Sequence, residues 1–109
     1  MSKRIPQLLI NDMLESFNKI LQYTDGMTFE EFANDSKTID AVIRNFEIIG
    51  EAANRLPEDF KDSHSQIDWY RIRGFRNRIV HDYMGIDFGI VWEIRNNYLL
   101  ILIDSLKSL

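Results

Sequence analysis

Apolar side chains recur every three or four residues over four long segments of the chain, which is the spacing of amphipathic α-helices. This pattern predicts helices over residues 4–24, 37–56, 69 to 80 or 81, and 88–107. A Thr-x-x-Glu capping box at Thr28 predicts a further short helix to about residue 33. Residues 58–66 are polar and lack a sustained period, so we expect a loop there with up to one helical turn.

The order of these segments predicts the fold class. No internal repeat, low-complexity tract or linker interrupts the chain, so residues 1–109 are expected to form a single domain. The domain is predicted to be all-α, an up-and-down four-helix bundle with short extra helical turns. Asp35 or Ser36, Asp68 and Asp87 are placed to cap the later long helices. Gly50, inside the second long helix, suggests that another backbone passes close to it.

The last predicted helix is apolar on most of its circumference, because Leu99, Leu100 and Ile103 widen the usual stripe. Such a helix needs two packing partners. One is its own bundle; the other is either a second subunit or, if the helix is simply central, the rest of the same bundle. A chain of 109 residues buries only a small core, which also favours a partner.

Composition excludes several classes of function. The chain has no cysteine, which excludes a disulfide framework, a zinc-thiolate site and a thiol nucleophile. It has no long apolar run, so no membrane span is expected. The first six residues lack the features of a signal peptide, so the expected location is the cytoplasm.

Positive charge is concentrated in one segment of the chain, although the net charge of the chain is negative. The net charge of -4 disfavours a non-specific nucleic-acid coat, yet four arginines fall within the eight residues from Arg71 to Arg78. This can be a local phosphate-binding focus. The alternative is a solvated helix face whose arginines pair with carboxylates. Glu51, on the polar face of the second long helix, is the carboxylate best placed to reach an arginine.

Two arginines, an amide, an imidazole and a phenol lie between Arg76 and Tyr83. On an ideal helix Arg73, Asn77 and His81 share one stripe, and Arg76 shares a neighbouring one with Tyr83. Arg76 and His81 converge only through the reach of the arginine or if the helix unwinds near His81, which Gly85 makes plausible.

This set of side chains suits a phosphodiester. An imidazole titrates near neutral pH and can move a proton, and a guanidinium binds phosphate through two parallel hydrogen bonds. RNA cleavage then needs no metal or cofactor if a base takes the proton of the 2′-hydroxyl and an acid protonates the leaving oxygen. Because His81 alone cannot easily fill both roles, a two-fold dimer that brings a second copy of the motif is expected.

The motif resembles that of a known family. Arg76-x4-His81-x-Tyr83 in a small helical bundle resembles the Arg-x4-6-His motif of HEPN ribonucleases. The sequence Arg-Asn-Arg-Ile-Val-His-Asp-Tyr followed by Gly-Ile-Asp is similar to the HepT toxins. Residues 46–52 and 87–92 match as well, so the resemblance covers most of the chain.

The resemblance implies a homodimeric, metal-independent endoribonuclease toxin with the motif at the dimer interface. It also implies an MntA-type minimal nucleotidyltransferase antitoxin, which forms a hetero-oligomer with the toxin and silences it by transferring AMP to the motif tyrosine. By position, Arg76 and His81 become catalytic, Asn77 supporting, and Tyr83 the AMP acceptor. Arg73 and Glu51 complete the supporting set.

Two alternatives stay open. A HEPN-type module that binds a nucleotide or protein without turnover would use Arg76 and His81 for binding or structure. A metal phosphohydrolase is disfavoured, because only His64 remains to supply a second imidazole. Without the resemblance, Tyr83 would be interpreted as a core ring with a hydrogen-bonded hydroxyl.

Overall fold

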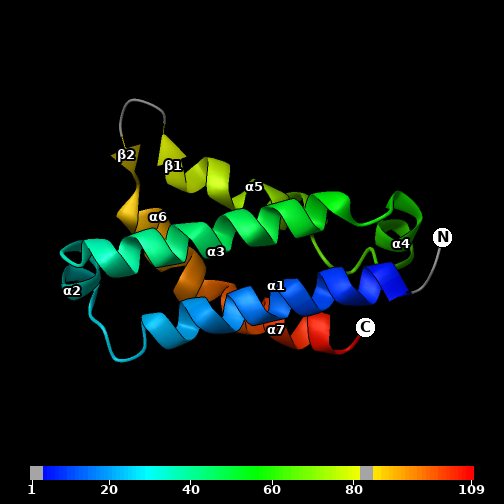
Figure 1. The fold of residues 1–109 in the computed structure, drawn as a ribbon, viewed down its shortest axis with the longest axis horizontal. Coiled ribbons are helices and arrows are strands. Elements are labelled where there is room, and N and C mark those ends of the chain that lie inside the picture. The colour runs from blue at the N-terminus through cyan, green and yellow to red at the C-terminus, as the bar shows by residue number, and fades with distance from the viewer. Residues whose placement is uncertain (1–3, 82–84) are drawn as a thin grey trace.

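Two long antiparallel helices, α1 (Arg4–Tyr23) and α3 (Ser36–Arg55), lie side by side at the centre of the bundle (Figure 1). The helix α5 (Trp69–Ile79) packs on α3, and α7 (Leu99–Lys107) packs on α1. The neighbouring helices therefore bury the apolar stripes that the sequence pattern identified.

The computed structural model describes residues 4–81 and 85–109. Within these ranges most of the chain is helical and only two strands of two residues each are present, so the predicted all-α bundle is confirmed. None of the helices in the described part combines the length and the apolarity needed to cross a membrane.

Phenylalanine rings from successive helices build the core. Phe17 of α1, Phe46 of α3 and Phe75 of α5 are fully buried. The rings of Phe46 and Phe75 meet edge to face, with their centroids 5.9 Å apart. Aromatic pairs in this geometry stabilise a protein beyond the area that they bury. Phe75 therefore anchors α5 to the long central helix.

Side-chain caps fix where the helices begin. The capping box at Thr28 is present and starts α2 (Phe29–Ala33). Asp35, Asp68 and Asp87 each accept a hydrogen bond from the backbone N–H three residues further on, as predicted. The backbone and hydroxyl of Thr38 both donate to Asp35, which lowers the pKa of this carboxyl below its ordinary value.

The close approach predicted at Gly50 is confirmed. A Cβ atom at Gly50 would lie 3.5 Å from the backbone oxygen of Arg73 in α5. Gly50 therefore lies on the side of α3 that faces the α5 backbone. The next residue, Glu51, lies about 100° further round the helix and is exposed.

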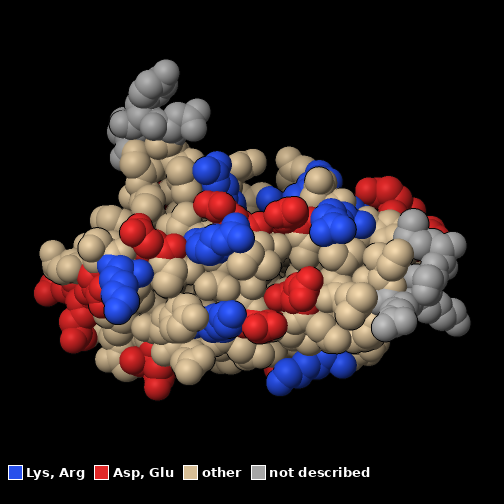
Figure 2. Space-filling model, in the orientation of Figure 1, with Lys and Arg blue, Asp and Glu red and all other residues tan. Residues whose placement is uncertain are grey.

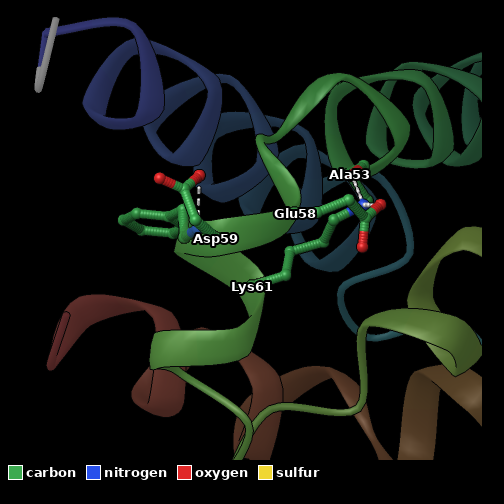
Figure 3. Close-up of polar contacts among 5 residues, drawn as sticks. Ala53, Glu58, Asp59 and Lys61 are labelled. Atoms are coloured by element: carbon green, nitrogen blue, oxygen red, sulfur yellow. Dashed lines mark hydrogen bonds and ion pairs between the residues drawn. The ribbon is translucent and has the colours of Figure 1, made fainter. Parts of the chain in front are cut away.

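The expectation of a loop over residues 58–66 is corrected in part, because α4 (Glu58–Ser63) is a helix of six residues. Lys61 stabilises its junction with α3. The ammonium group of Lys61 donates to the backbone oxygen of Ala53 at 3.3 Å and lies 3.1 Å from a carboxylate oxygen of Glu58 (Figure 3). Carbonyls in the last turn of a helix lack internal partners, so this buried lysine satisfies one of them.

The last predicted helix is also corrected, because it is divided at Tyr98 into α6 (Phe88–Asn97) and α7. Tyr98 has φ −124° and ψ −31°, outside the helical region. The bend lets α6 contact α5 while α7 lies along α1. The guanidinium of Arg71 stacks over the Tyr98 ring, 4.7 Å from its centroid, and holds the bend against α5.

Candidate functional site

The helix α5 ends at Ile79, and the chain then forms a short antiparallel pair that projects from the bundle (Figure 1). Its strands are β1 (Val80–His81) and β2 (Gly85–Ile86), with His81 opposite Gly85. Gly85 has φ +80°, a conformation that favours glycine, and the N–H of Asp87 donates to the backbone oxygen of Ile79 at 2.7 Å. The unwinding expected near His81 is therefore confirmed.

This pair of strands was not predicted, since two residues per strand cannot show an alternating pattern. It corrects the expected helical stripe of Arg73, Asn77 and His81. Arg73 and Asn77 lie on α5, whereas His81 lies beyond the end of the helix on extended backbone.

Asp87 connects the start of α6 to His81. One carboxylate oxygen of Asp87 accepts the capping hydrogen bond from Ile90 N–H at 3.1 Å, and the other lies 3.9 Å from Nε2 of His81. The second distance is too long for a hydrogen bond but short enough for charge attraction once the imidazole is protonated. The sequence pattern indicated only a capping role for Asp87. The glycine turn between the two residues was the signal that could have brought them together.

Three arginines on α5 have no ion-pair partner among the described residues. Arg71 pairs with Asp68 at 3.8 Å, but no carboxylate in residues 4–81 and 85–109 lies within ion-pairing distance of Arg73, Arg76 or Arg78. Elsewhere the surface differs: acidic and basic side chains alternate over the face formed by α1 and α3 (Figure 2). The end of α5 is thus a local positive region on an acidic protein.

Two hollows that share no lining residue contain three of the candidate residues. One, of about 570 Å³, is lined by residues of α5 that include Arg73 and Asn77. The other, of about 460 Å³, contains both His81 and Asp87. The side chain of Arg76 is half-buried and lines neither of these hollows. Neither of these two hollows therefore contains Arg76, Asn77 and His81 together.

The contact predicted for Glu51 is not found, and the prediction made for Tyr83 is not tested. Glu51 makes no ion pair with any arginine in the described part of the chain, so the expected contact between Glu51 and an arginine is not formed there. Tyr83 lies outside the described residues, and the prediction made for it stays a prediction.

Comparison with known proteins identifies relatives over most of the chain. Residues 13–109 match the family described as Ribonuclease HepT-like. A protein of Methanocaldococcus jannaschii named "Putative RNase MJ0127" is 42% identical over 94 residues, which cover 86% of this chain and 78% of the relative. The "Probable ribonuclease HepT" of Thermococcus cleftensis is 38% identical over 91 residues, or 84% of this chain and 83% of the relative. No solved structure matches the chain.

Proposed function

Because the chain belongs to the HepT-like ribonuclease family of HEPN proteins, we propose that it is an endoribonuclease toxin that cleaves RNA, without a metal ion, at the end of α5. The observation that carries this proposal is the placement of His81 beside the Asp87 carboxylate, directly beyond a helix in which Arg73, Arg76 and Arg78 have no carboxylate partner among the described residues. Cleavage of a phosphodiester requires a group that transfers protons and a cation that stabilises negative charge, and an imidazole and nearby guanidinium groups can supply these.

The proposed reaction uses a proton transfer at each end of the scissile bond. A base takes the proton of the 2′-hydroxyl, the 2′-oxygen bonds to phosphorus, and the bond from phosphorus to the 5′-oxygen breaks as an acid protonates that oxygen. One of these two proton transfers is assigned to His81. Arg76 stabilises the added negative charge on the phosphate, and Asn77 and Arg73 support the phosphate or its neighbours.

We assign the second proton role to a second copy of the chain. The side chain of His81 is 46% exposed, and the hollow along α5 and the hollow around His81 are both open to solvent, so a partner copy has access to both. A two-fold axis beside this end would place two histidines and two Arg76 side chains in one cleft. A monomeric mass in light scattering at micromolar concentration would contradict this arrangement.

The regulation that we propose involves Tyr83 and an MntA-type nucleotidyltransferase antitoxin. An adenylate on the Tyr83 oxygen would place an anionic phosphate two residues after His81, where it would compete with the phosphate of RNA. Mass spectrometry after incubation with the antitoxin and ATP tests this step. Mass added at another residue, or at none, would refute it.

Cleavage of RNA in the presence of EDTA tests the proposed activity. We expect wild type to cleave, and Arg76→Lys to lose about 100-fold or more in rate, because lysine cannot reproduce the two parallel hydrogen bonds of a guanidinium. Intact RNA after incubation with folded wild type would refute metal-independent cleavage. Binding of a nucleotide without cleavage under any condition would favour a non-catalytic module.

A further inference from the structure

The polar residues of α5 form one continuous face that begins well before the proposed catalytic residues. Tyr70, Arg73, Gly74, Asn77 and Arg78 follow the spacing i, i+3, i+4, i+7 and i+8, which places them on the same side of a helix. Over these residues the helix rises about 12 Å at its ordinary pitch and leads directly to β1. The face therefore runs along the axis of α5 toward His81.

Tyr70 is an unusual residue for an exposed position. Its side chain is 80% exposed, more than any other large hydrophobic residue in the described part of the chain. The guanidinium of Arg73 lies 5.8 Å from the centroid of the Tyr70 ring. An exposed ring beside a guanidinium offers a stacking surface for a base next to a charge for its phosphate.

A hollow adjoins this ring. Tyr70, Arg71, Arg73, Gly74, Asn77 and Arg78 line the hollow of about 570 Å³ described above. A Cβ atom added at Gly74 would meet nothing within 4 Å. The absence of a side chain at Gly74 therefore keeps open a space that the rest of the protein does not fill.

We infer that this face of α5 is a subsite for single-stranded RNA, in which a base stacks on Tyr70 and the adjoining phosphates bind Arg73 and Arg78. The inference rests on the proposed ribonuclease function and extends its substrate site away from the scissile bond. A base can lie flat on Tyr70 only if it is not already stacked in a duplex, so the subsite selects single strands.

The charges beyond Tyr70 limit the length of the subsite. On the side of the ring that faces away from β1, the lining of a third hollow contains three carboxylates, Glu58, Asp62 and Asp68, against two cations, Lys61 and Arg73, so its charged side chains are negative on balance. These carboxylates repel phosphate. The bound strand therefore extends from Tyr70 toward His81 and not toward α4.

Equilibrium binding of a fluorescein-labelled single-stranded RNA tests the subsite. The full-length His81→Ala protein serves as the background, so that RNA stays intact during the measurement. Adding Tyr70→Ala should weaken binding roughly 5- to 150-fold, the value of stacking one base on an aromatic ring. Tyr70→Phe keeps the ring and should bind within about twofold of the background.

Tyr23→Ala is the matched control, because Tyr23 is also an exposed tyrosine but lies on α1. It should leave RNA affinity unchanged, and affinity for duplex RNA should not depend on Tyr70. Arg73→Ala should reduce the dependence of the binding constant on salt, by a logarithmic slope of about 0.7 for one lost phosphate contact. Gly74→Gln should weaken binding by filling the hollow.

Equal RNA affinity of Tyr70→Ala and Tyr23→Ala would overturn the subsite. Unchanged RNA affinity with a loss of self-association in light scattering would also overturn it and would assign this face to a protein contact. The proposed function fails separately. If wild type does not cleave RNA but binding depends on Tyr70, the nuclease proposal is refuted and the subsite stands. If wild type cleaves and Tyr70→Ala binds and cleaves equally well, only the subsite is refuted.

Discussion

Truncating Phe75 tests whether α5 has a structural face and a separate functional face. Phe75 is fully buried and packs edge to face on Phe46 of α3, whereas Tyr70 on the same helix is 80% exposed. We therefore expect Phe75→Ala to unfold the protein more easily. Tyr70→Ala should leave the free energy of unfolding almost unchanged.

The burial of the two rings sets the size of these effects. Removing a fully buried phenylalanine ring costs about 3–5 kcal/mol, which includes the cavity that it leaves. Domains of this length have a free energy of unfolding of about 5–15 kcal/mol, so the variant should still be folded at room temperature unless the wild-type value is near the lower end of this range. Its melting temperature should fall by about 12 °C or more. Tyr70→Ala should change the free energy of unfolding by less than about 0.5 kcal/mol.

Denaturant unfolding followed by far-ultraviolet circular dichroism measures both variants under the same conditions. A destabilisation of Phe75→Ala below about 1 kcal/mol would show that this ring is not held in the core. A loss of similar size in Tyr70→Ala would show that the ring of Tyr70 is packed against the protein and is not available to a ligand. Either result would refute the division of α5 into two faces.

Three further variants test local contacts. Lys61→Ala should lower the free energy of unfolding by about 2 kcal/mol in denaturant melts, since a buried ammonium group and its aliphatic stem are lost. Glu58→Ala should lower it by under about 1 kcal/mol, because the Glu58 side chain is 80% exposed. Equal losses in the two variants would contradict the role given to Lys61. Asp35 has a lowered pKa in the folded state, so its stabilising contribution is present above its unfolded pKa and is lost as the pH falls through its folded pKa. The stability difference between wild type and Asp35→Asn should therefore shrink in melts below about pH 4, and a difference that grows there would refute the assignment. Asp87→Asn keeps an effective helix cap but removes the negative charge near His81. The rate of RNA cleavage should fall by up to about sixfold, because the attraction between two charges at this distance is roughly 1 kcal/mol in water, and the free energy of unfolding should stay unchanged. An unchanged cleavage rate would show that Asp87 is not part of the site.

The sequence predicted most helix starts because their signals are local. Thr28, Asp68 and Asp87 are capping residues followed by helical periodicity, and each caps a helix in the structure. The close approach at Gly50 was also predictable, since a glycine inside an amphipathic helix often marks a place where another backbone passes nearby.

The features that sequence reasoning missed depend on contacts between distant segments. The break at Tyr98 has no glycine or proline to mark it and follows from packing α6 and α7 on different neighbours. The partial burial of His64 and its contact with the Phe60 ring, 4.6 Å between centroids, depend on α4 forming a helix. In the same way, the position of Asp87 beside His81 depends on the pairing of two very short strands.

In the candidate site too, features set by local sequence were predictable and features set by contacts between distant segments were not. The concentration of arginines near His81 was visible in the sequence, and the structure adds that Arg73, Arg76 and Arg78 have no carboxylate partner among the described residues. The helical stripe through His81 was wrong, because helical phase was extrapolated past the end of α5. The exposure of Tyr70 was not predicted, because an aromatic residue at a helix start is compatible with either face.

The proposed function depends above all on cleavage of RNA through His81 at the end of α5. The chain contains two histidines, and His64 supplies a matched control because it is the C-cap of α4 and lines neither the hollow along α5 nor the hollow around His81. The decisive measurement is the rate of RNA cleavage in EDTA by His81→Ala and His64→Ala, with both proteins shown to be folded. We expect His81→Ala to abolish cleavage and His64→Ala to cleave like wild type. Equal cleavage by His81→Ala and wild type would contradict the proposed role of His81.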